Sequence, residues 1–364
     1  MRDIVLDGPV DREITVGGRR YLYFGGNNYL GLACHGAVLT AARQALVASG
    51  LSAAASRETS GTMREHLELE RALAEFWGSP EAAIFSSGYL AVDSAVEALS
   101  EDAGGILLDE KTHVAGADAA RRTGLPVAAF AHRSPDSLAR AARERRARRI
   151  LVLTDGVFPS DGAIAPLDRH LAALDGLEAT LLVDDAHALG VLGEKGRGTA
   201  EHLGVTADPR VRTVSTLSKA MGAFGGAVPC DAALRDRIRA TRAYVGATPI
   251  PPPIAAGAAV AVRLLAGDPS ILARLRANVA RMKSGLRARG VGSADDSPVP
   301  IVSIAWPDRA RLERAHGALR DRGLLVPLIR YPGGPEFGSL RLTVSAAHRP
   351  EDVDRLLEAW ERIA

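Results

Sequence analysis

The sequence has few cysteines, little net charge and no long apolar run, and each shortage excludes a class of protein. Its two cysteines, Cys34 and Cys230, form neither a disulfide framework nor the paired spacing of a metal site. A net charge of +2 gives no argument for a nucleic-acid or membrane partner. No uncharged apolar run reaches the ~20 residues of a membrane span, and the N-terminus carries early acids instead of the apolar core of a signal peptide. We therefore expect a cytoplasmic protein.

Length and composition are otherwise ordinary. The chain of 364 residues is 47% apolar and 24% charged, as expected of a soluble globular protein. This length accommodates one large domain and a smaller one. The arginine-rich stretch 140–149 interleaves alanine and glutamate with its arginines, which favours a solvated helix over a nucleic-acid-binding patch.

Lysine is scarce, and this makes Lys219 informative. Among 45 basic side chains there are four lysines (Lys111, Lys195, Lys219 and Lys283), and the rest are arginines. A guanidinium stays protonated, whereas a desolvated lysine amine can lose its proton and form a Schiff base. Lys219 follows the apolar stretch 211–214, which places it at a strand end or in a loop, where catalytic groups are often presented. The alternatives are a solvated surface lysine or an arginine bias that reflects base composition.

Short apolar segments alternate with helical patterns through most of the chain. Two short strands are expected around Gly17-Gly18, followed by helices at 37–49 and 64–77. Further strands are expected at 82–85, 105–108, 125–130, 150–154, 179–183 and 211–214, with helices at 89–100 and 135–148. Short continuous apolar strands between helices indicate a mainly parallel sheet covered on both faces, and hence an α/β fold.

The pattern changes near residue 250. Four prolines in the segment 248–253 exclude it from a helix or an inner strand. Helices are expected at 254–267, 270–289, 308–322 and 350–363, with strands at 299–305, 324–328 and 339–345. We divide the chain into an N-terminal segment 1–45, a large catalytic domain 46–265 and a small C-terminal α/β domain 266–364.

The residues that could carry chemistry come directly after the predicted strands, at 86–88, 109–113, 155, 184–187 and 216–219. Ligands collect at the carboxyl ends of strands in sheets of this kind. The shared placement predicts one active site at that edge of the sheet.

Asp184 ends an apolar strand, and His187 follows three residues later. Such a pair can bind a metal, but a metal would require further His, Cys or carboxylate ligands, and no second paired cluster is evident. The pair can instead hold a heterocycle, with Asp184 on a protonated ring nitrogen and His187 near a ring substituent. A capping aspartate beside a structural histidine is the simplest alternative.

Two weaker signals accompany this pair. Ser87, Gly88 and Tyr89 lie between a strand and a helix, where glycine permits close backbone approach and the free N–H groups of a helix start favour a phosphate. A plain strand-to-helix turn is the alternative. His113 follows a strand and an acidic stretch, where an imidazole can stack on a planar ligand or serve a structural role.

Together these signals predict pyridoxal 5'-phosphate (PLP) as the cofactor. PLP requires an amine for its aldehyde, a carboxylate for its pyridine nitrogen, a phosphate cradle and a flat partner for its ring. Lys219, Asp184, the turn at Ser87 and His113 could supply these in turn. Four modest signals in this combination are more specific than any one of them.

The order of these segments and their amino-acid sequences resemble those of the α-oxoamine synthases, a branch of the fold-type I PLP enzymes, over nearly the whole chain. The resemblance is carried by the segments 27–32, 56–57, 60–62, 66–70, 87–89, 109–113, 155–158, 161–162, 183–187, 190–193, 196–199, 216–226, 248–253 and 340–348. It implies a mainly parallel central sheet that binds PLP, with a smaller C-terminal α/β domain.

The resemblance also implies roles for the strand-end residues. Lys219 would hold the cofactor's aldehyde and Asp184 would pair with the pyridinium nitrogen. His113 would stack on the ring face, and His187 would hydrogen-bond the phenolic oxygen. These four residues are the expected catalytic set.

The remaining site residues follow from the same resemblance. Backbone N–H groups of the turn at Ser87, Gly88 and Tyr89 would hold the phosphate together with Thr216. Thr248 would reach the phosphate of the neighbouring subunit, which implies a homodimer with shared active sites. Asn27 and Arg341 would hold the amino-acid carboxylate, the arginine through a bidentate fork.

The reaction that the family implies is a decarboxylative condensation of an amino acid with an acyl thioester, on CoA or a carrier protein, in which the freed Lys219 removes the α-proton. The chain would be an acyltransferase that makes an α-amino ketone. The alternatives are another member of the family with a different amino acid and acyl group, another fold-type I PLP enzyme such as an aminotransferase, or a non-catalytic partner subunit.

Some positions depart from the family pattern. Val92 stands where the family usually has Asn. Pro159 begins the segment 159–163, where the usual sequence in the family is Ser-Met-Asp-Gly-Asp. His132, Arg133 and Ser134 stand where His-Asn-Asp is usual. None of these positions removes a residue that the PLP chemistry needs.

Overall fold

A computed structural model describes residues 4–145, 149–331 and 334–363 of the chain. Packing divides the chain into two compact units, and neither is continuous in sequence. The first unit takes the described residues up to His35, the segment Pro159–Ala163 and the described residues from Asp268 on. The second unit takes Gly36–Phe158 and Ile164–Gly267.

The second unit is built on a seven-stranded sheet in the order β3-β9-β8-β7-β6-β4-β5. Its strands are β3 (Glu81–Phe85), β4 (Gly105–Asp109), β5 (Val127–Phe130), β6 (Arg149–Asp155), β7 (Glu178–Asp184), β8 (Val211–Thr216) and β9 (Gly226–Cys230). Pairing is parallel from β8 through β7, β6 and β4 to β5, while β9 runs antiparallel to both β3 and β8. The expected mainly parallel sheet is confirmed, although β9 was not among the predicted strands.

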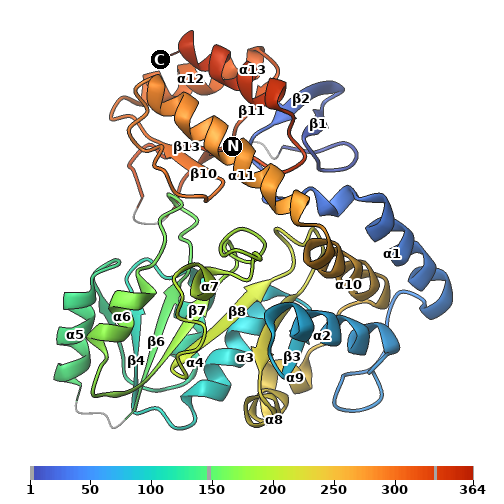
Figure 1. Ribbon diagram of the computed structural model, residues 1–364, viewed down its shortest axis with the longest axis vertical. Coiled ribbons are helices and arrows are strands. Elements are labelled where there is room, and N and C mark those ends of the chain that lie inside the picture. Colours follow the sequence, from blue (N-terminus) through green and yellow to red (C-terminus); the bar gives the residue numbers. More distant parts are fainter. Residues whose placement is uncertain (1–3, 146–148, 332–333, 364) are drawn as a thin grey trace. The chain divides into compact units, whose positions relative to one another are not determined.

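The strands are apolar because both faces of the sheet are covered. The interior residues of β6 and β7, such as Leu151, Val152, Leu181 and Leu182, are almost completely buried. Figure 1 shows β4, β6, β7 and β8 side by side with helices packed along them. Parallel strands covered in this way read as unbroken apolar runs, and their polar residues are confined to the carboxyl ends.

Helices fill the rest of the second unit: α1 (Gly36–Ser49), α2 (Arg64–Trp77), α3 (Gly88–Ser100), α4 (Val114–Arg122), α5 (Pro135–Glu144), α6 (Leu167–Ala173), α7 (Thr199–His202), α8 (Ala232–Ala240), α9 (Arg242–Gly246) and α10 (Pro252–Gly267). The expected helix 135–148 ends at Glu144, and positions 146–148 lie outside the described residues. The expectation that 248–253 holds no helix is corrected, because Pro252 and Pro253 occupy the first turn of α10. Proline is tolerated there since its missing N–H would have had no partner within the helix.

The first unit contains two three-stranded sheets. One has the order β1-β2-β11 and the other β10-β13-β12. The strands are β1 (Glu13–Val16), β2 (Arg19–Tyr23), β10 (Ile301–Ile304), β11 (Leu324–Leu325), β12 (Leu328–Ile329) and β13 (Ser339–Thr343), with helices η1 (Leu32–Cys34), α11 (Pro269–Ala288), α12 (Arg309–Asp321) and α13 (Pro350–Glu361). The first strands of the chain are thus completed by β11, which pairs with β2 in parallel.

The packing groups the chain differently from the three-part division at residues 45 and 265. Helix α1 packs against α10 and therefore belongs with the second unit, so the boundary falls at Gly36. The short segment Pro159–Ala163 leaves the second unit and packs in the first, where Gly162 lies against Ile301. The three-part division stays a proposal about which parts fold independently.

In the described part of the chain no single helix is long and apolar enough to cross a membrane. The consecutive helices α10 and α11, with a bend between them, are together long and apolar enough for a span. The apolar residues of α10 are largely buried, which is also the property of a core helix.

Candidate functional site

Two aspartates end neighbouring parallel strands. Asp155 of β6 and Asp184 of β7 are paired in register, and the Gly156 N–H donates to the Asp184 carbonyl at 2.8 Å. Burial raises the pKa of Asp184, and the charge of Lys219 together with the hydrogen bond from the Ala186 N–H partly offsets that shift. Burial and the neighbouring Asp184 carboxylate raise the pKa of Asp155 well above its ordinary value. A cation brought to these carboxylates would therefore be strongly favoured.

Lys219 lies in the turn that joins β8 to β9. The turn is closed by hydrogen bonds from the Leu217 N–H to the Gly225 carbonyl at 2.8 Å and from the Gly222 N–H to the Lys219 carbonyl at 3.0 Å. The side chain of Lys219 is partly buried. Its charge acts on both Asp155 and Asp184. The structure thus brings the predicted lysine and the predicted aspartate to one edge of the sheet.

His113 caps the start of α4, at the end of the short turn that follows β4. Its own N–H donates to Asp155 Oδ1 at 3.0 Å, and its Nδ1 accepts from the Ala115 N–H at 3.3 Å. The ring itself is exposed. Asp155 therefore holds the backbone of the turn that presents His113, a connection that the sequence did not reveal.

His187 is buried in the turn after β7, where the Ala188 N–H donates to the Asp185 carbonyl at 2.9 Å. The sequence did not indicate that Asp185 has a structural role distinct from that of Asp184. Its carboxylate accepts from the Thr199 N–H at 3.0 Å and the Thr199 hydroxyl at 2.7 Å. It packs so closely on Gly156 and Gly198 that a Cβ at either glycine would lie 2.1 Å from its oxygens. These contacts fix the loop that carries Asp184 and His187.

The turn before α3 has the features of an anion cradle. Ser87 is the N-cap of α3, and its hydroxyl accepts from the Leu90 N–H at 3.2 Å. The N–H groups of Gly88 and Tyr89 belong to the first turn, where a helix leaves its donors without intrahelical partners. A Cβ at Gly88 would lie 2.7 Å from the Thr216 Cβ, so glycine alone permits this approach. The structure therefore brings Ser87, Gly88, Tyr89 and Thr216 together.

Thr216 is held from the other side by the β8–β9 turn. Its hydroxyl donates to the Gly225 carbonyl at 2.9 Å and lies 2.7 Å from the Ser218 hydroxyl. Ser218 is exposed, sits next to Lys219 and was not singled out from sequence. Because the single Thr216 proton goes to Gly225, the Ser218 hydroxyl donates to the Thr216 oxygen, and either hydroxyl must turn to donate to a ligand. The Tyr89 side chain is exposed and its hydroxyl donates to Asp118.

Thr248 lies in the second unit just before α10 and is exposed. It is separated from the buried Ile250 by a single proline. An exposed hydroxyl at this position is available to another molecule.

Asn27 and Arg341 lie in the first unit, where the structure brings them to each other. Arg341 is 3% exposed. Its Nε–H donates to the Pro159 carbonyl at 2.9 Å, one terminal nitrogen donates to Asn27 Oδ1 at 3.2 Å, and the other lies 3.4 Å from the Tyr29 hydroxyl. A guanidinium has five N–H donors, so each terminal nitrogen retains one for a further acceptor. Two parallel donors of this kind are what a carboxylate accepts.

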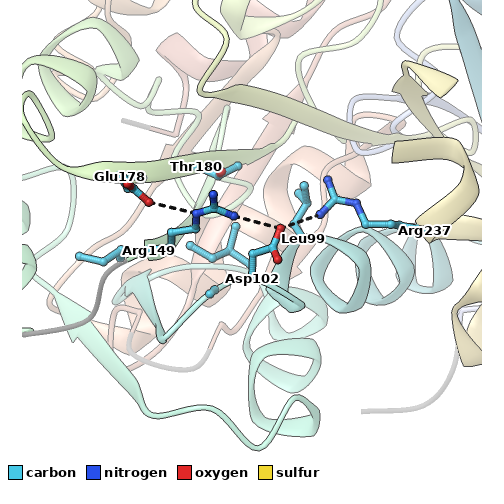
Figure 2. Close-up of a pocket in the computed structure, with 10 residues that line it drawn as sticks. Leu99, Asp102, Arg149, Glu178, Thr180 and Arg237 are labelled. Carbon is cyan, nitrogen blue, oxygen red and sulfur yellow. Dashed lines mark hydrogen bonds and ion pairs between the residues drawn. The ribbon is translucent and has the colours of Figure 1, made fainter. Parts of the chain in front are cut away.

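A hollow of about 330 Å³ opens elsewhere in the second unit, at the amino ends of β6 and β7. Its charged side chains pair with one another: Arg149 with Asp102 and Glu178, and Arg237 with Asp102 (Figure 2). None of the predicted site residues lines it. Its position at the opposite ends of the strands separates it from the residues described above.

Comparisons with known proteins agree in direction. Residues 19–359 match the family model of class I and II aminotransferases. A curated 8-amino-7-oxononanoate synthase of Methylococcus capsulatus is 40% identical over 98% of this chain and 92% of its own length. A serine palmitoyltransferase of Sphingomonas wittichii is 31% identical, with a TM-score of 0.93 over 100% of this chain and 92% of that one. A structure of serine palmitoyltransferase with its PLP internal aldimine is 28% identical, with a TM-score of 0.94 over 99% of this chain and 92% of that one.

Proposed function

Since this chain belongs to the class I and II aminotransferase family and, within it, to the α-oxoamine synthases, which are PLP-dependent acyltransferases, we propose that it makes 8-amino-7-oxononanoate. The carbon skeleton of that product divides into the part of alanine that survives decarboxylation and a pimeloyl group, a straight acyl chain that ends in a carboxylate. The proposed substrates are therefore L-alanine and a pimeloyl thioester. The curated relatives of that name support this choice.

The residues of the second unit fit PLP. The cradle at α3 is one that a Cβ at Gly88 would fill, and its donors are of the kind that bind phosphate. The raised pKa of Asp184, which is due to burial, favours a cationic partner such as a protonated ring nitrogen. When bound, PLP supplies an electron sink that stabilises negative charge at the α-carbon of an amino acid.

The observation that carries the proposal is the position of Lys219 just after β8, the strand next to β7, with the paired carboxylates Asp155 and Asp184 at the ends of β6 and β7. We assign Lys219 to the cofactor's aldehyde and Asp184 to its ring nitrogen. When PLP is bound, His113 would cover the ring face, and His187 would donate to the ring oxygen. Because no other lysine shares this setting among the described residues, Lys219 Nζ is also the group that takes the α-proton from the amino acid.

We assign the phosphate to the N–H groups of Gly88 and Tyr89, in the turn capped by Ser87, and to the Thr216 hydroxyl. Ser218 extends this set, because its hydroxyl lies beside that of Thr216. The negative charge of a phosphate is stabilised at the N-terminus of a helix of this length.

Arg341 and Asn27 are assigned to the carboxylate of the amino acid. The guanidinium is oriented by three contacts and retains two donors. A fork held in this way distinguishes a carboxylate from other acceptors, and it would keep its orientation when the substrate leaves.

The reaction balances as a condensation. Lys219 Nζ accepts the α-proton, and the α-carbon forms a bond with the thioester carbonyl carbon. The thiolate leaves with the electron pair of the carbon–sulfur bond and takes a proton from solvent. The carboxylate leaves as CO₂, and the electron pair that remains at the α-carbon takes a proton back from Lys219 Nζ. The product is an α-amino ketone.

A homodimer is proposed because the second unit exposes apolar side chains along α1 and just after it. Leu39, Leu46, Val47 and Leu51 are 52%, 42%, 85% and 74% exposed. Several large apolar side chains exposed along one short segment indicate an interaction site. A partner there is a second copy of this chain, and exposed Thr248 would then contact the phosphate in the partner's site.

The test is direct product analysis. Purified protein loaded with PLP is incubated with L-alanine and pimeloyl-CoA, and 8-amino-7-oxononanoate is measured by mass spectrometry together with released thiol and CO₂. Lys219→Ala should form no product. A PLP-loaded protein that releases no thiol with alanine, glycine or serine and any acyl thioester would contradict the acyltransferase assignment.

A second candidate rests on the serine palmitoyltransferases, whose folds match with TM-scores of 0.93 and 0.94. Serine and palmitoyl-CoA therefore belong in the same panel. Release of thiol with this pair and not with alanine and pimeloyl-CoA would favour the second candidate.

A further inference from the structure

His66 is a fully buried histidine that the proposed reaction does not use. It lies in the first turn of α2, at the third helical position, and is 0% exposed. Its Nδ1 accepts from the Met63 N–H at 3.1 Å, which caps the helix. Its Nε2 lies 2.7 Å from the carbonyl oxygen of Ile250, far away in the sequence.

These two contacts fix the tautomer of the ring. The Met63 N–H is a donor, so Nδ1 must carry a lone pair and the proton must sit on Nε2. Nε2–H then donates to the Ile250 carbonyl. Burial lowers the pKa of His66, which keeps the ring in the neutral form that both contacts require.

The Ile250 carbonyl belongs to the segment that links α9 to α10. Prolines at 249 and 251 flank Ile250 and restrict its backbone. The Pro251 carbonyl accepts from Ile254 and Ala255 at the start of α10. The segment is therefore anchored by α10 on one side and by His66 at Ile250, which lies two residues after the exposed Thr248.

The Ile250 side chain extends the connection to the phosphate turn. It is 1% exposed and packs on Gly225, where a Cβ would lie 2.7 Å from the Ile250 Cδ1. Gly225 has a φ of +135°, which side chains rarely adopt. Its carbonyl accepts from both the Leu217 N–H and the Thr216 hydroxyl.

We propose that His66 is a positioning residue for the phosphate end of the cofactor site, acting through its hydrogen bond to the Ile250 carbonyl. The bond fixes the segment that presents Thr248 to the partner subunit and seats Ile250 against Gly225, which orients Thr216. This inference rests on the proposed roles of Thr216 and Thr248. It assigns to His66 a function beyond the capping of α2.

Two amide substitutions separate capping from positioning. In His66→Asn, the side-chain oxygen is as many bonds from the backbone as Nδ1 is in histidine, so it can still accept from the Met63 N–H. The asparagine side chain is too short to donate to the Ile250 carbonyl. In His66→Gln, the side-chain N–H is as many bonds from the backbone as Nε2 is in histidine, so it can still donate to the Ile250 carbonyl. A glutamine at this helical position can also cap the helix. Both are neutral, so buried charge does not enter the comparison.

The measurement is the dissociation constant of PLP for the full-length apoprotein, followed by absorbance, beside that of pyridoxal, which lacks the phosphate. His66→Asn should weaken PLP binding about tenfold, the effect of losing one oriented contact, and leave pyridoxal binding unchanged. His66→Gln should restore PLP affinity to within about threefold of the unsubstituted protein. Equal losses for PLP and pyridoxal, or an unchanged PLP affinity in a folded His66→Asn protein, would overturn the proposal.

Ile250→Val provides a milder second test if His66→Asn does not fold. It removes the methyl that rests on Gly225 and is a small change that a folded core tolerates. It should lower the preference for PLP over pyridoxal, and an unchanged preference would count against the connection through Ile250. Thr248→Val is the reference. If it weakens PLP binding and His66→Asn does not, only the proposed role of His66 is wrong. If neither Thr248→Val nor Thr216→Val weakens PLP binding, the proposed phosphate site itself is wrong.

Discussion

Lysine 219 can be tested against a matched lysine elsewhere in the same unit. Lys219→Arg should abolish turnover and the visible absorbance of bound PLP, because a guanidinium stays protonated and does not form the Schiff base. Lys111→Arg is the control, since Lys111 is exposed. Turnover that survives in Lys219→Arg would refute the assignment.

Lys283 would be a poor control for that experiment. It is 2% exposed, and its amine donates to Asp295 at 2.5 Å and to the Ser297 carbonyl at 3.0 Å. An arginine is larger and flatter, so Lys283→Arg should cost about 1–3 kcal/mol of stability through overpacking. A loss of turnover in Lys283→Arg could therefore come from unfolding and not from a change in the chemistry.

His170 predicts an unusual dependence of stability on pH. It is 0% exposed, neither ring nitrogen has a hydrogen-bond partner within the described residues, and burial lowers its pKa to about 4. The unfolded chain takes up this proton below the ordinary pKa of about 6.5, whereas the folded chain does so near 4, so stability is lost as pH falls between these values.

His170→Leu removes this group and replaces an unsatisfied polar ring with an apolar side chain. The free energy of unfolding should rise by about 1–3 kcal/mol, and its decrease between pH 6.5 and 4 should become shallower. His348, whose pKa burial also lowers to about 4, keeps part of the slope. Denaturant titrations at a series of pH values measure both effects, and an unchanged slope would mean that His170 keeps its ordinary pKa.

The residues that sequence could identify share one property: they directly follow an apolar run. Asp184 and Lys219 were placed at strand ends for that reason, and the structure has them there, although their roles stay predictions. Asp185 and His66 could not be identified, because what distinguishes them is a partner distant in sequence, Thr199 in one case and Ile250 in the other. No local pattern encodes such a contact.

The turn between β5 and α5 is an element whose sequence conflicts with its backbone. Arg133 has a φ of +54°, in the left-handed region that asparagine and glycine tolerate better. The position is the middle of His132-Arg133-Ser134, where the resemblance leads one to expect asparagine. Its N–H donates to Asp109 at 2.8 Å, and that contact holds the conformation.

Arg133→Asn should therefore stabilise the protein by about 1 kcal/mol, because strain is relieved and the backbone contact to Asp109 is kept. The exposed side-chain bond from Arg133 to the Ile164 carbonyl would be lost, which costs little at the surface. Arg140→Asn, within helix α5, is a control that should not stabilise. Thermal melts distinguish the two, and a destabilised Arg133→Asn would show that the side-chain bond dominates.

At the level of elements, the pattern of apolar residues located most helices and strands of the sheet. The strand β9 was missed because its sequence, Gly-Ala-Val-Pro-Cys, carries a glycine and a proline. The proline is tolerated at Pro229, opposite Ala82 of β3. The helices α4, α6, α7, α8 and α9 were also not predicted. None is longer than nine residues, and so short a segment shows little of the helical period.

For the whole molecule, the exposed apolar surface of α1 predicts that cofactor binding and assembly are linked. Val47→Glu places a charge at the most exposed of these side chains and should shift the protein toward monomer. PLP affinity should fall with it, by about tenfold, because Thr248 acts in the partner's site. Analytical ultracentrifugation and PLP titration on the same samples test the link.

Val127→Lys is the matched control. Val127 is 36% exposed on the edge strand β5, where a lysine is readily accommodated. It should change neither the oligomeric state nor PLP affinity. A monomeric Val47→Glu protein with undiminished PLP affinity would contradict the proposed role of Thr248.

The pairing of β2 with β11 has a consequence for how the protein is made. Leu22 meets Leu324 in that pairing, so one of the earliest strands to leave the ribosome waits for one of the last. At about 5–20 residues per second, the wait is on the order of tens of seconds. During that time Gly36–Phe158 and Ile164–Gly267 are complete enough to fold, whereas the nascent N-terminus has an unpaired edge. The β1–β2 hairpin therefore keeps an open edge until β11 has been made, and a chaperone that covers this edge would protect it from pairing with other chains.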